Sequence, residues 1–439
     1  MMRVTLFLIK AIAMQRDYAF IVARYLTIAL PVLILWPVPS DIAICTIAAL
    51  FLWRSARTRD WSWCRERWAQ VLGILWLYMV ARGLFAAHPH DAMGRALPFG
   101  RYIVFSAGIA RWTLLHAPTR RLFARTLTAM VVVSACDGLL QWLIDFDLLL
   151  HLAVHVPSAG AEHVRLTGPF SKPILGIMLT WLAFPALLPL LLTPNGKPKE
   201  SRKLLEGLAC MLATFAAIAL SGERIALMLL LMGCCAGALL LPLRKRVVLM
   251  GLVAIVALLG ALALLSPAMV KRQVVSTQET LAHWNQSPYG MLLASDLTLA
   301  VQNPVFGLGT GQFRTSCEAL YVRDTARIQE MCKTHPHNVY LEWLIESGII
   351  GLGLFVAFMV AVFGDCARVF SKLKGNPLFT GMLIAFIFRA WPFMSSTGFF
   401  SRWASPPFWL VLGGLLVYTR RQPEPRDADP AFTLQDTGL

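Results

Sequence analysis

Apolar residues occur along this chain in long unbroken runs separated by short polar segments. Each run approaches the roughly 20 residues that an α-helix needs to cross a bilayer. The runs are rich in Leu, Ala and Ile and lack the short alternating segments of a membrane β-barrel. The pattern predicts an all-α polytopic membrane protein with about twelve transmembrane helices. Their expected limits are 18–37, 39–53, 69–86, 96–115, 124–146, 173–193, 204–221, 224–241, 246–268, 338–363, 376–394 and 405–419.

An additional apolar run near the start of the chain, 5–13, is too short to cross a membrane. It is not followed by a small-residue cleavage site before a polar mature start, so it does not have the features of a signal peptide. We expect an interfacial helix there.

The composition agrees with a membrane protein. Hydrophobic residues make up 57% of the 439 positions, and Asp, Glu, Lys and Arg only 15%, against about 25% charged residues in ordinary soluble domains. These values exclude a soluble globular enzyme, a disordered chain and a disulfide-dense secreted module.

Basic residues are concentrated in alternate connections between the predicted helices, and such connections face the cytoplasm. They are Arg54, Arg57, Arg59, Arg65, Arg67, Arg111, Arg120, Arg121, Lys197, Lys199, Arg202, Lys203, Arg244, Lys245, Arg246, Arg368, Lys372, Lys374, Arg420 and Arg421. With an even number of spans, both termini are then cytoplasmic. The net charge of +16 follows from this asymmetry, and no nucleic-acid partner is needed to explain it.

The opposite side carries a long connection at 269–337, and connections of this length usually have a function or are disordered. It contains several aromatic residues, which favours a folded periplasmic loop, with a helix at 295–302 and a glycine-rich turn at 307–311. The expected organisation is nine transmembrane helices in 1–268, the loop at 269–337, three helices in 338–420 and a cytoplasmic tail at 421–439.

Cysteine usage supports this division of the chain. Cys317 and Cys332 are the two cysteines of the long loop, and the other seven fall in apolar runs or in or beside inner connections. Because the outer compartment is oxidising, we predict a Cys317–Cys332 disulfide; two free thiols are the alternative.

Six arginines lie on or near the predicted outer side, against the orientation bias. They are Arg82, Arg101, Arg165, Arg224, Arg389 and Arg402. A single arginine there could be an interfacial residue whose charge reaches water. Six together indicate an anionic ligand, and the planar guanidinium suits phosphate oxygens.

Arg224 has the most defined setting of the six. It lies in the tight turn between two predicted helices and begins the second, where free backbone N–H groups favour an anion. Its neighbour Glu223 is an alternative partner, in which case the pair is structural.

A second polar group ends the long loop, where His335, Pro336, His337 and Asn338 precede an apolar run. Asn338 is suited to cap the following helix. The positive helix end disfavours an imidazolium, so a neutral His337 able to accept a proton is expected. The alternatives are a histidine that only packs and a metal site; for the latter no third or fourth ligand occurs at close spacing.

These residues resemble the signature of the O-antigen ligase and polymerase superfamily, in which His337-Asn338 is followed by Gly348 and Gly351 after a large periplasmic loop. The segments 303–309 and 165–170 are similar to that family's loop and to its stretch before the sixth helix. One departure is that 289–293 carries no arginine, where family members often have one; Lys271, Arg272 or Arg389 could replace it.

The resemblance implies an inner-membrane glycosyltransferase that moves O-antigen from undecaprenyl diphosphate to a lipid A-core sugar hydroxyl, with inversion and without nucleotide or metal. His337 would be the general base. Arg224, with Arg389, Arg402 or Arg165, would bind the diphosphate. His335, Asn338, Tyr340 and Glu342 would orient the base or the acceptor.

Three alternatives remain open from the sequence. An O-antigen polymerase would use a second lipid-linked repeat as acceptor, and a protein O-oligosaccharyltransferase would use a Ser or Thr. A secondary transporter or flippase would form no covalent product, but transporters usually carry paired broken helices with polar groups near the midplane. The sugars at either side of the new bond and the oligomeric state are not encoded in any pattern we find.

Overall fold

The computed structural model of the chain describes residues 2–144, 165–324, 332, 335–393 and 398–420, with side chains from Tyr18 onward. Within these residues the regular structure is helical, apart from one isolated bridge between Leu192 and Pro198. The predicted tail at 421–439 lies outside the described residues, as does most of the connection at 147–172.

Every apolar run that the sequence predicts as a transmembrane helix is helical in the structure. These helices are α1 (Met2–Leu33), α2 (Pro37–Thr58), α3 (Arg67–Leu84), α4 (Pro89–Gly108), α5 (Ala117–Ile144), α7 (Leu175–Leu191), α8 (Ser201–Leu220), α9 (Arg224–Leu240), α10 (Lys245–Leu265), α16 (Val339–Leu373), α17 (Pro377–Ala390) and α18 (Ser405–Thr419).

Five of the described helices, α2, α5, α8, α10 and α16, are long and apolar enough to cross a membrane by length and composition. Shorter apolar helices are α7, α9, α17, α18 and Tyr18–Leu33 of α1. The all-helical membrane character is therefore confirmed, and the count of twelve crossings stays a prediction.

The start of the chain differs from expectation. We expected a separate interfacial helix at 5–13, but α1 is continuous from Met2 to Leu33. Neither Gly nor Pro occurs between 13 and 18, so nothing in the backbone interrupts the i to i−4 hydrogen bonds there.

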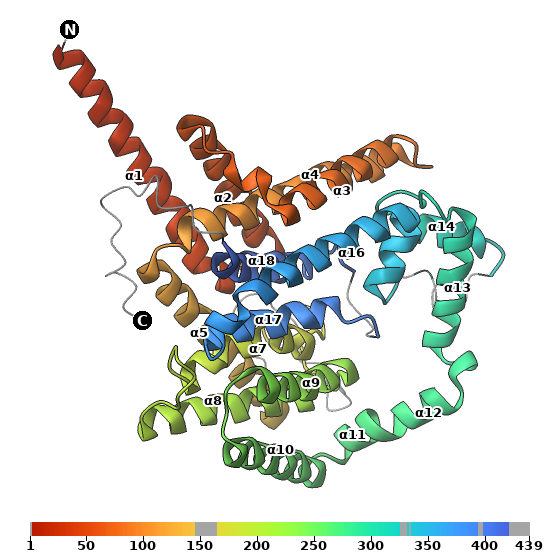
Figure 1. Cartoon of the computed structure of the whole chain (residues 1–439). Coiled ribbons are helices and arrows are strands. Elements are labelled where there is room, and N and C mark those ends of the chain that lie inside the picture. Colours follow the sequence, from red (N-terminus) through yellow and green to blue (C-terminus); the bar gives the residue numbers. More distant parts are fainter. Residues whose placement is uncertain (1, 145–164, 325–331, 333–334, 394–397, 421–439) are drawn as a thin grey trace.

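The bundle has a buried centre and an exposed margin. Nearly every residue of α7 is buried, and α17, α8 and α5 pack around it. Along α10 only Leu262 is buried, and this helix lies at the edge of the bundle in Figure 1. An apolar helix with so little packing fits a position against lipid.

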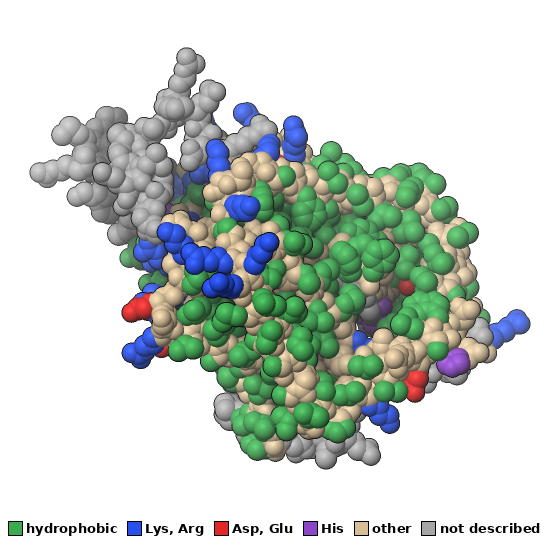
Figure 2. Space-filling model, turned by 60° about the horizontal axis from the view of Figure 1, so that its bottom comes forward, with side chains coloured by type: hydrophobic (Ala, Val, Ile, Leu, Met, Phe, Trp, Pro, Cys, Tyr) green, Lys and Arg blue, Asp and Glu red, His purple; other side chains and the backbone are tan. Residues whose placement is uncertain are grey.

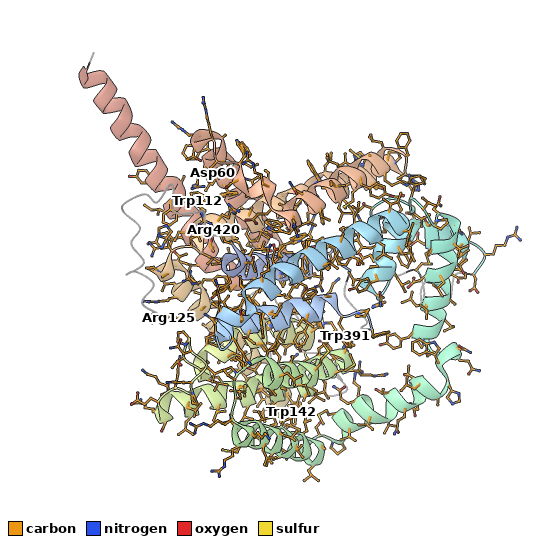
Figure 3. The ribbon with its side chains drawn as sticks, viewed as in Figure 1. Asp60, Trp112, Arg125, Trp142, Trp391 and Arg420 are labelled. Atoms are coloured by element: carbon orange, nitrogen blue, oxygen red, sulfur yellow. A yellow bond between two sulfur atoms is a disulfide. The ribbon has the colours of Figure 1, made fainter. Side chains whose placement is uncertain are left out.

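The two ends of the bundle differ in charge. Figure 3 places Asp60, Arg125 and Arg420 toward one side and Trp391, which follows α17, toward the other. Lys and Arg side chains gather over one part of the surface in Figure 2, beside a broad hydrophobic face. The basic end holds the connections identified from the sequence; its cytoplasmic orientation stays a prediction.

The long connection is folded, as expected. It contains α11 (Pro267–Val270), a π-helical turn (Lys271–Val275), α12 (Ser276–Ala282), a 3₁₀ turn (Trp284–Gln286), α13 (Pro288–Gln302) and α14 (Phe313–Leu320). In Figure 1 it runs from α10 around to the start of α16. The helix expected at 295–302 begins earlier, because Ser287 accepts the Gly290 N–H (3.1 Å) and Pro288 suits the first helical turn.

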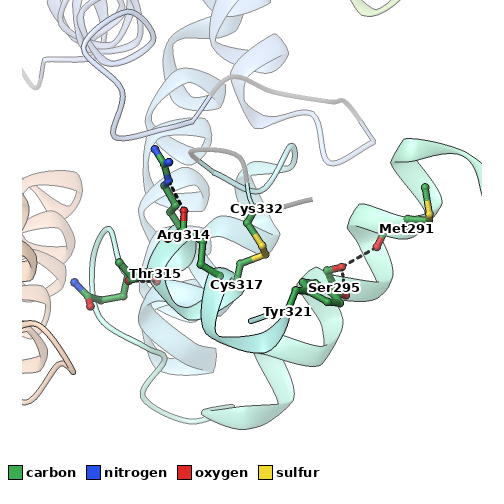
Figure 4. The surroundings of a disulfide bond; sticks show 9 residues. Met291, Ser295, Arg314, Thr315, Cys317, Tyr321 and Cys332 are labelled. Carbon is green, nitrogen blue, oxygen red and sulfur yellow. Dashed lines mark hydrogen bonds and ion pairs between the residues drawn. A yellow bond between two sulfur atoms is a disulfide. The ribbon is translucent and has the colours of Figure 1, made fainter. Parts of the chain in front are cut away.

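The loop has its own small core, in which Leu299, Leu308 and Phe313 pack on Ile345 of α16. The predicted disulfide between Cys317 and Cys332 is present in this core (Figure 4). Figure 4 also shows Tyr321 beside α13, where its hydroxyl lies 2.6 Å from Ser295 Oγ. The disulfide thus joins α14 to the chain just before the histidines.

Candidate active site at one end of the bundle

Asn338 caps α16, as the sequence predicts. Its Oδ1 accepts the N–H groups of Tyr340 (2.9 Å) and Leu341 (3.2 Å). Its Nδ2 donates to the Pro392 carbonyl (2.6 Å), and the Tyr340 hydroxyl donates to the Ala390 carbonyl (2.5 Å). The start of α16 is therefore fastened to the end of α17.

The two histidines lie together before this cap. The rings of His335 and His337 are 4.8 Å apart, and both side chains are half-buried. Gly398 lies against His335, because a Cβ built on this glycine would stand 2.9 Å from the His335 Cγ. A space-filling view shows histidine and basic side chains inside a hollow of the surface (Figure 2).

Arg389 of α17 and Glu342 of α16 are both buried. Arg389 is 4% exposed, and its guanidinium lies 4.2 Å from the Trp181 ring and near Phe399. The Phe399 N–H donates to Glu342 Oε2 (2.7 Å), and Glu342 interacts electrostatically with Arg389. Nε and Nη1 of Arg389 have no hydrogen-bond partner among the described residues. Arg389 is thus enclosed by aromatic rings and does not line an open surface.

Gly348 marks a kink in α16 where the loop docks. Its φ of 64° and ψ of −171° favour glycine, and a Cβ there would lie 2.2 Å from the Val305 carbonyl oxygen. The Ile349 N–H donates to the Pro304 carbonyl (2.8 Å), and the Leu308 N–H to the Ile345 carbonyl (2.8 Å). The glycine of the family-like signature is needed because the 303–309 segment touches the α16 backbone.

Two of the six outer arginines have structural partners. Arg82 donates from Nε (3.0 Å) and Nη2 (2.8 Å) to the Gly307 carbonyl, and Tyr78 of the same helix donates to the Ser347 carbonyl (2.8 Å). Arg101 forms an ion pair with Asp41 (2.7 Å). Arg82 therefore holds the loop on α16.

The turn between α8 and α9 contains a buried carboxylate. Glu223 precedes α9, and its Oε1 accepts the Gly176 N–H (3.0 Å) at the start of α7. Burial raises the pKa of Glu223 to about 7, although Arg165 and the backbone N–H groups oppose this shift. Gly176 permits the contact, because a Cβ there would collide with Ser221 Oγ at 2.2 Å.

Arg165 is the ion-pair partner of Glu223, with 3.9 Å between Nη2 and Oε2. The alternative in which Glu223 pairs with Arg224 is not what the structure has: Arg224 Nη1 donates to Thr280 Oγ1 of α12 (3.0 Å). Neighbouring residues at a helix start point in different directions, so the pair in sequence is not a pair in space.

Arg272 joins this group from the long loop. Its Nε donates to the Gly222 carbonyl (2.7 Å). Burial lowers the pKa of Arg272, and the nearby charges of Arg165 and Arg224 lower it further. The guanidinium groups of Arg165 and Arg272 thus lie near Glu223, and that of Arg224 lies near Arg272. We call Arg165, Arg224 and Arg272 the arginine cluster. The sequence named Arg272 only as one substitute for a missing arginine, and its distance along the chain gives no signal of this contact.

Helix α7 connects the arginine cluster to Arg389. Gly176 contacts Glu223, and Trp181 contacts Arg389; five residues of helix separate the two contacts by about 7.5 Å along the axis. Arg402 is exposed in the turn before α18, and the ring of its neighbour Trp403 lies 5.8 Å from Phe170.

Within the described residues, no group of three or more His, Cys, Asp and Glu side chains is arranged to hold a metal ion.

The family model described as O-antigen ligase matches residues 209–356. This segment includes Arg224, Arg272, the disulfide, His337 and Gly348. Members of the family are membrane glycosyltransferase-like enzymes that act on lipid-linked polysaccharides. No curated protein matches the chain. The match supports the resemblance seen at His337, Asn338, Gly348 and Gly351, and the matched third of the chain is similar to the O-antigen ligase and polymerase superfamily.

Proposed function

We propose that the protein is an O-antigen ligase of the bacterial inner membrane, which transfers O-antigen from undecaprenyl diphosphate to a sugar hydroxyl of lipid A-core on the periplasmic side. The observation that carries this proposal is the arginine cluster. Two of its three guanidinium groups, those of Arg165 and Arg272, lie near the Glu223 carboxylate, and Arg224 donates instead to Thr280. The raised pKa of Glu223, about 7, leaves its carboxylate only partly ionised near neutral pH. Such an excess of positive charge suits a diphosphate.

The donor then reacts by displacement at its anomeric carbon. The acceptor oxygen forms the new bond as the bond to the diphosphate breaks, and negative charge develops on the leaving group. Arg224 stands at the first position of α9, where backbone N–H groups add to the favourable field for an anion. Groups fixed before the reaction stabilise this charge without reorganising.

His337 takes the proton of the acceptor hydroxyl in this mechanism. It directly precedes the Asn338 cap, and the positive end of α16 favours a neutral ring. Four further residues are positioning residues. They are His335, whose ring is tilted at 47° to that of His337, and Asn338, Tyr340 and Glu342, which fix α16 to its neighbours.

Arg389 and Arg402 have different roles in this mechanism. Arg389 is enclosed, so it acts through Glu342 and the Phe399 backbone and not by touching the donor. Arg402 is exposed and available to the diphosphate or to the outer part of the glycan.

The test is ligation in vitro with purified protein, lipid-linked donor and lipid A-core, in the presence of a chelator. We expect a covalent product from the natural protein and a sharp loss in His337→Ala, with unchanged thermal unfolding. Near-normal activity of His337→Ala would remove the base role.

The same assay separates the alternative functions through the acceptor. A product with a second lipid-linked repeat indicates a polymerase, and a product with a pilin-like protein indicates a protein O-oligosaccharyltransferase. Movement of solute without any donor and without a covalent product would indicate a transporter.

A further inference from the structure

A groove of about 430 Å³ lies between α3 and α16, and none of its lining residues belongs to the arginine cluster. Arg67 and Gln70 line it from the start of α3, and Gly364 and Arg368 from the late part of α16. Arg368 stands 21 residues beyond Ser347, where Tyr78 of α3 contacts α16, or about 30 Å along the helix. The groove therefore belongs to the basic end of the bundle.

The walls of the groove are apolar and face outward. Val71, Ala357 and Val360 line it, and Val360 is 64% exposed. Gly364 opens the floor, since a Cβ built there would meet no atom within 4 Å. An apolar hollow on the outer surface of a membrane bundle is a surface for hydrocarbon chains.

The rim of the groove is positively charged. It has the guanidinium groups of Arg67 and Arg368 and one carboxylate, Asp365, which forms an ion pair with Arg368. Glu66, next to Arg67, is already paired with Arg111. Arg67 is also the first residue of α3, whose backbone N–H groups favour an anion.

We propose that this groove binds an anionic phospholipid from the leaflet at the basic end. Its phosphate would lie between Arg67 and Arg368, with an acyl chain along Val71, Ala357 and Val360. Each basic residue near an anionic lipid surface strengthens binding roughly fivefold. The site is independent of the proposed ligation.

Native mass spectrometry of the full-length protein in detergent tests this site, with phosphatidylglycerol or phosphatidylcholine added at equal concentration. The variant Arg67→Gln with Arg368→Gln removes both charges and keeps a donor for Asp365. Gly364→Leu fills the groove and keeps the charges. The matched control, Arg202→Gln with Lys203→Gln, removes two exposed charges from the start of α8 at the same end.

The natural protein and the control should retain phosphatidylglycerol in preference to phosphatidylcholine. The first variant should bind it roughly 25-fold more weakly, by the same fivefold factor for each charge, and Gly364→Leu should also lose it. Inorganic phosphate should not displace the lipid, because it has no acyl chain to pack against the apolar walls of the groove.

Equal retention in the natural protein and in either groove variant would overturn the proposal. So would an equal loss in the control, which would indicate diffuse attraction by the whole basic end. Displacement by inorganic phosphate would indicate a plain anion site. A lipid-independent dimer that Gly364→Leu dissociates, measured by light scattering, would assign the groove to a second copy of the chain.

Discussion

Arg224 and Arg389 were both identified because they lie on the predicted outer side, against the usual placement of basic residues in inner connections. Their surroundings in the folded protein are nevertheless opposite. Arg224 is half-buried at a helix start among polar groups, near Arg165 and Arg272. Arg389 is enclosed by Trp181, Phe399 and Phe408, with the Glu342 carboxyl as its neighbour. An arginine near the outer side of a membrane protein can therefore either bind a substrate or stabilise the structure around the binding site. Only its surroundings in the folded protein distinguish these two roles.

The largest effect is expected at Arg224, the arginine that we propose to bind the substrate. Arg224→Ala should lower the ligation rate roughly 100- to 1,000-fold, as expected when a preorganised stabilising group is lost. Its unfolding temperature should change little, since its described hydrogen bond is a single one to Thr280. Arg202→Ala, on the exposed start of α8, is the control and should keep full activity. A loss of less than about tenfold would deny Arg224 a part in stabilising the leaving group.

The structural side is tested by Arg389→Ala, which should destabilise the protein by roughly 2–5 kcal/mol because it removes a buried side chain packed against three aromatic rings and leaves a cavity there. Denaturant unfolding measures this loss. Replacing both residues, Arg389→Met with Glu342→Gln, should recover most of it. If Arg389→Ala unfolded like the natural protein but lost activity like Arg224→Ala, the two arginines would share one role.

The disulfide lies in the long loop that carries Arg272 and ends near His335, and its removal tests whether this loop has a core separate from the bundle. Cys317→Ser should cost roughly 3 kcal/mol, the value for a closed loop of about 15 residues, and the loss should be confined to α13 and α14. Hydrogen exchange should rise there and not in α7. Cys136→Ser, an exposed free cysteine, should change neither region. Faster exchange throughout the bundle would contradict a separate loop core.

Two glycines of α16 offer a matched pair. Gly348→Ala should destabilise by roughly 1–3 kcal/mol from backbone strain, because its φ is 64° and Val305 touches it. Gly353→Ala, in an open helical position, should be neutral or slightly stabilising. Thermal unfolding distinguishes them, and equal behaviour would mean that the loop does not dock at the kink.

The last expected effect is a pH dependence of stability at Glu223. Its pKa is raised by burial from 4.5 to about 7, so the folded state holds this proton more tightly than the unfolded state. The associated stability is complete below pH 4.5 and is lost as the pH rises through about 7. Glu223→Gln should lack this slope, so its stability relative to the natural protein should increase with pH. A constant difference across this range would show that Glu223 does not titrate there.

Local features were predictable. The cap at Asn338 and the pairing of the two loop cysteines were anticipated correctly, because each follows from a few neighbouring residues or from the compartment of one segment. The folded loop was also expected, but the predicted start of α13 at 295 was too late, since Ser287 acts as a cap eight residues before it.

Contacts between distant segments were not predictable. Arg82 bonds to Gly307 across 225 residues, and Arg272 bonds to Gly222 across 50. The alternative of a Glu223–Arg224 pair is excluded for the same reason, since Glu223 pairs with Arg165. Adjacency in sequence says little about which side chains meet when three helices and a loop converge.

The sequence by itself determined that the chain is a bundle of apolar helices with a folded outer loop and a family signature at His337, because helix length and burial of apolar surface depend on the residues within each run. The tertiary structure alone decided which arginines gather around Glu223 and which one is enclosed by aromatic rings. That choice depends on how α7 packs against α9 and α17, and packing is a property of the surfaces of several helices together.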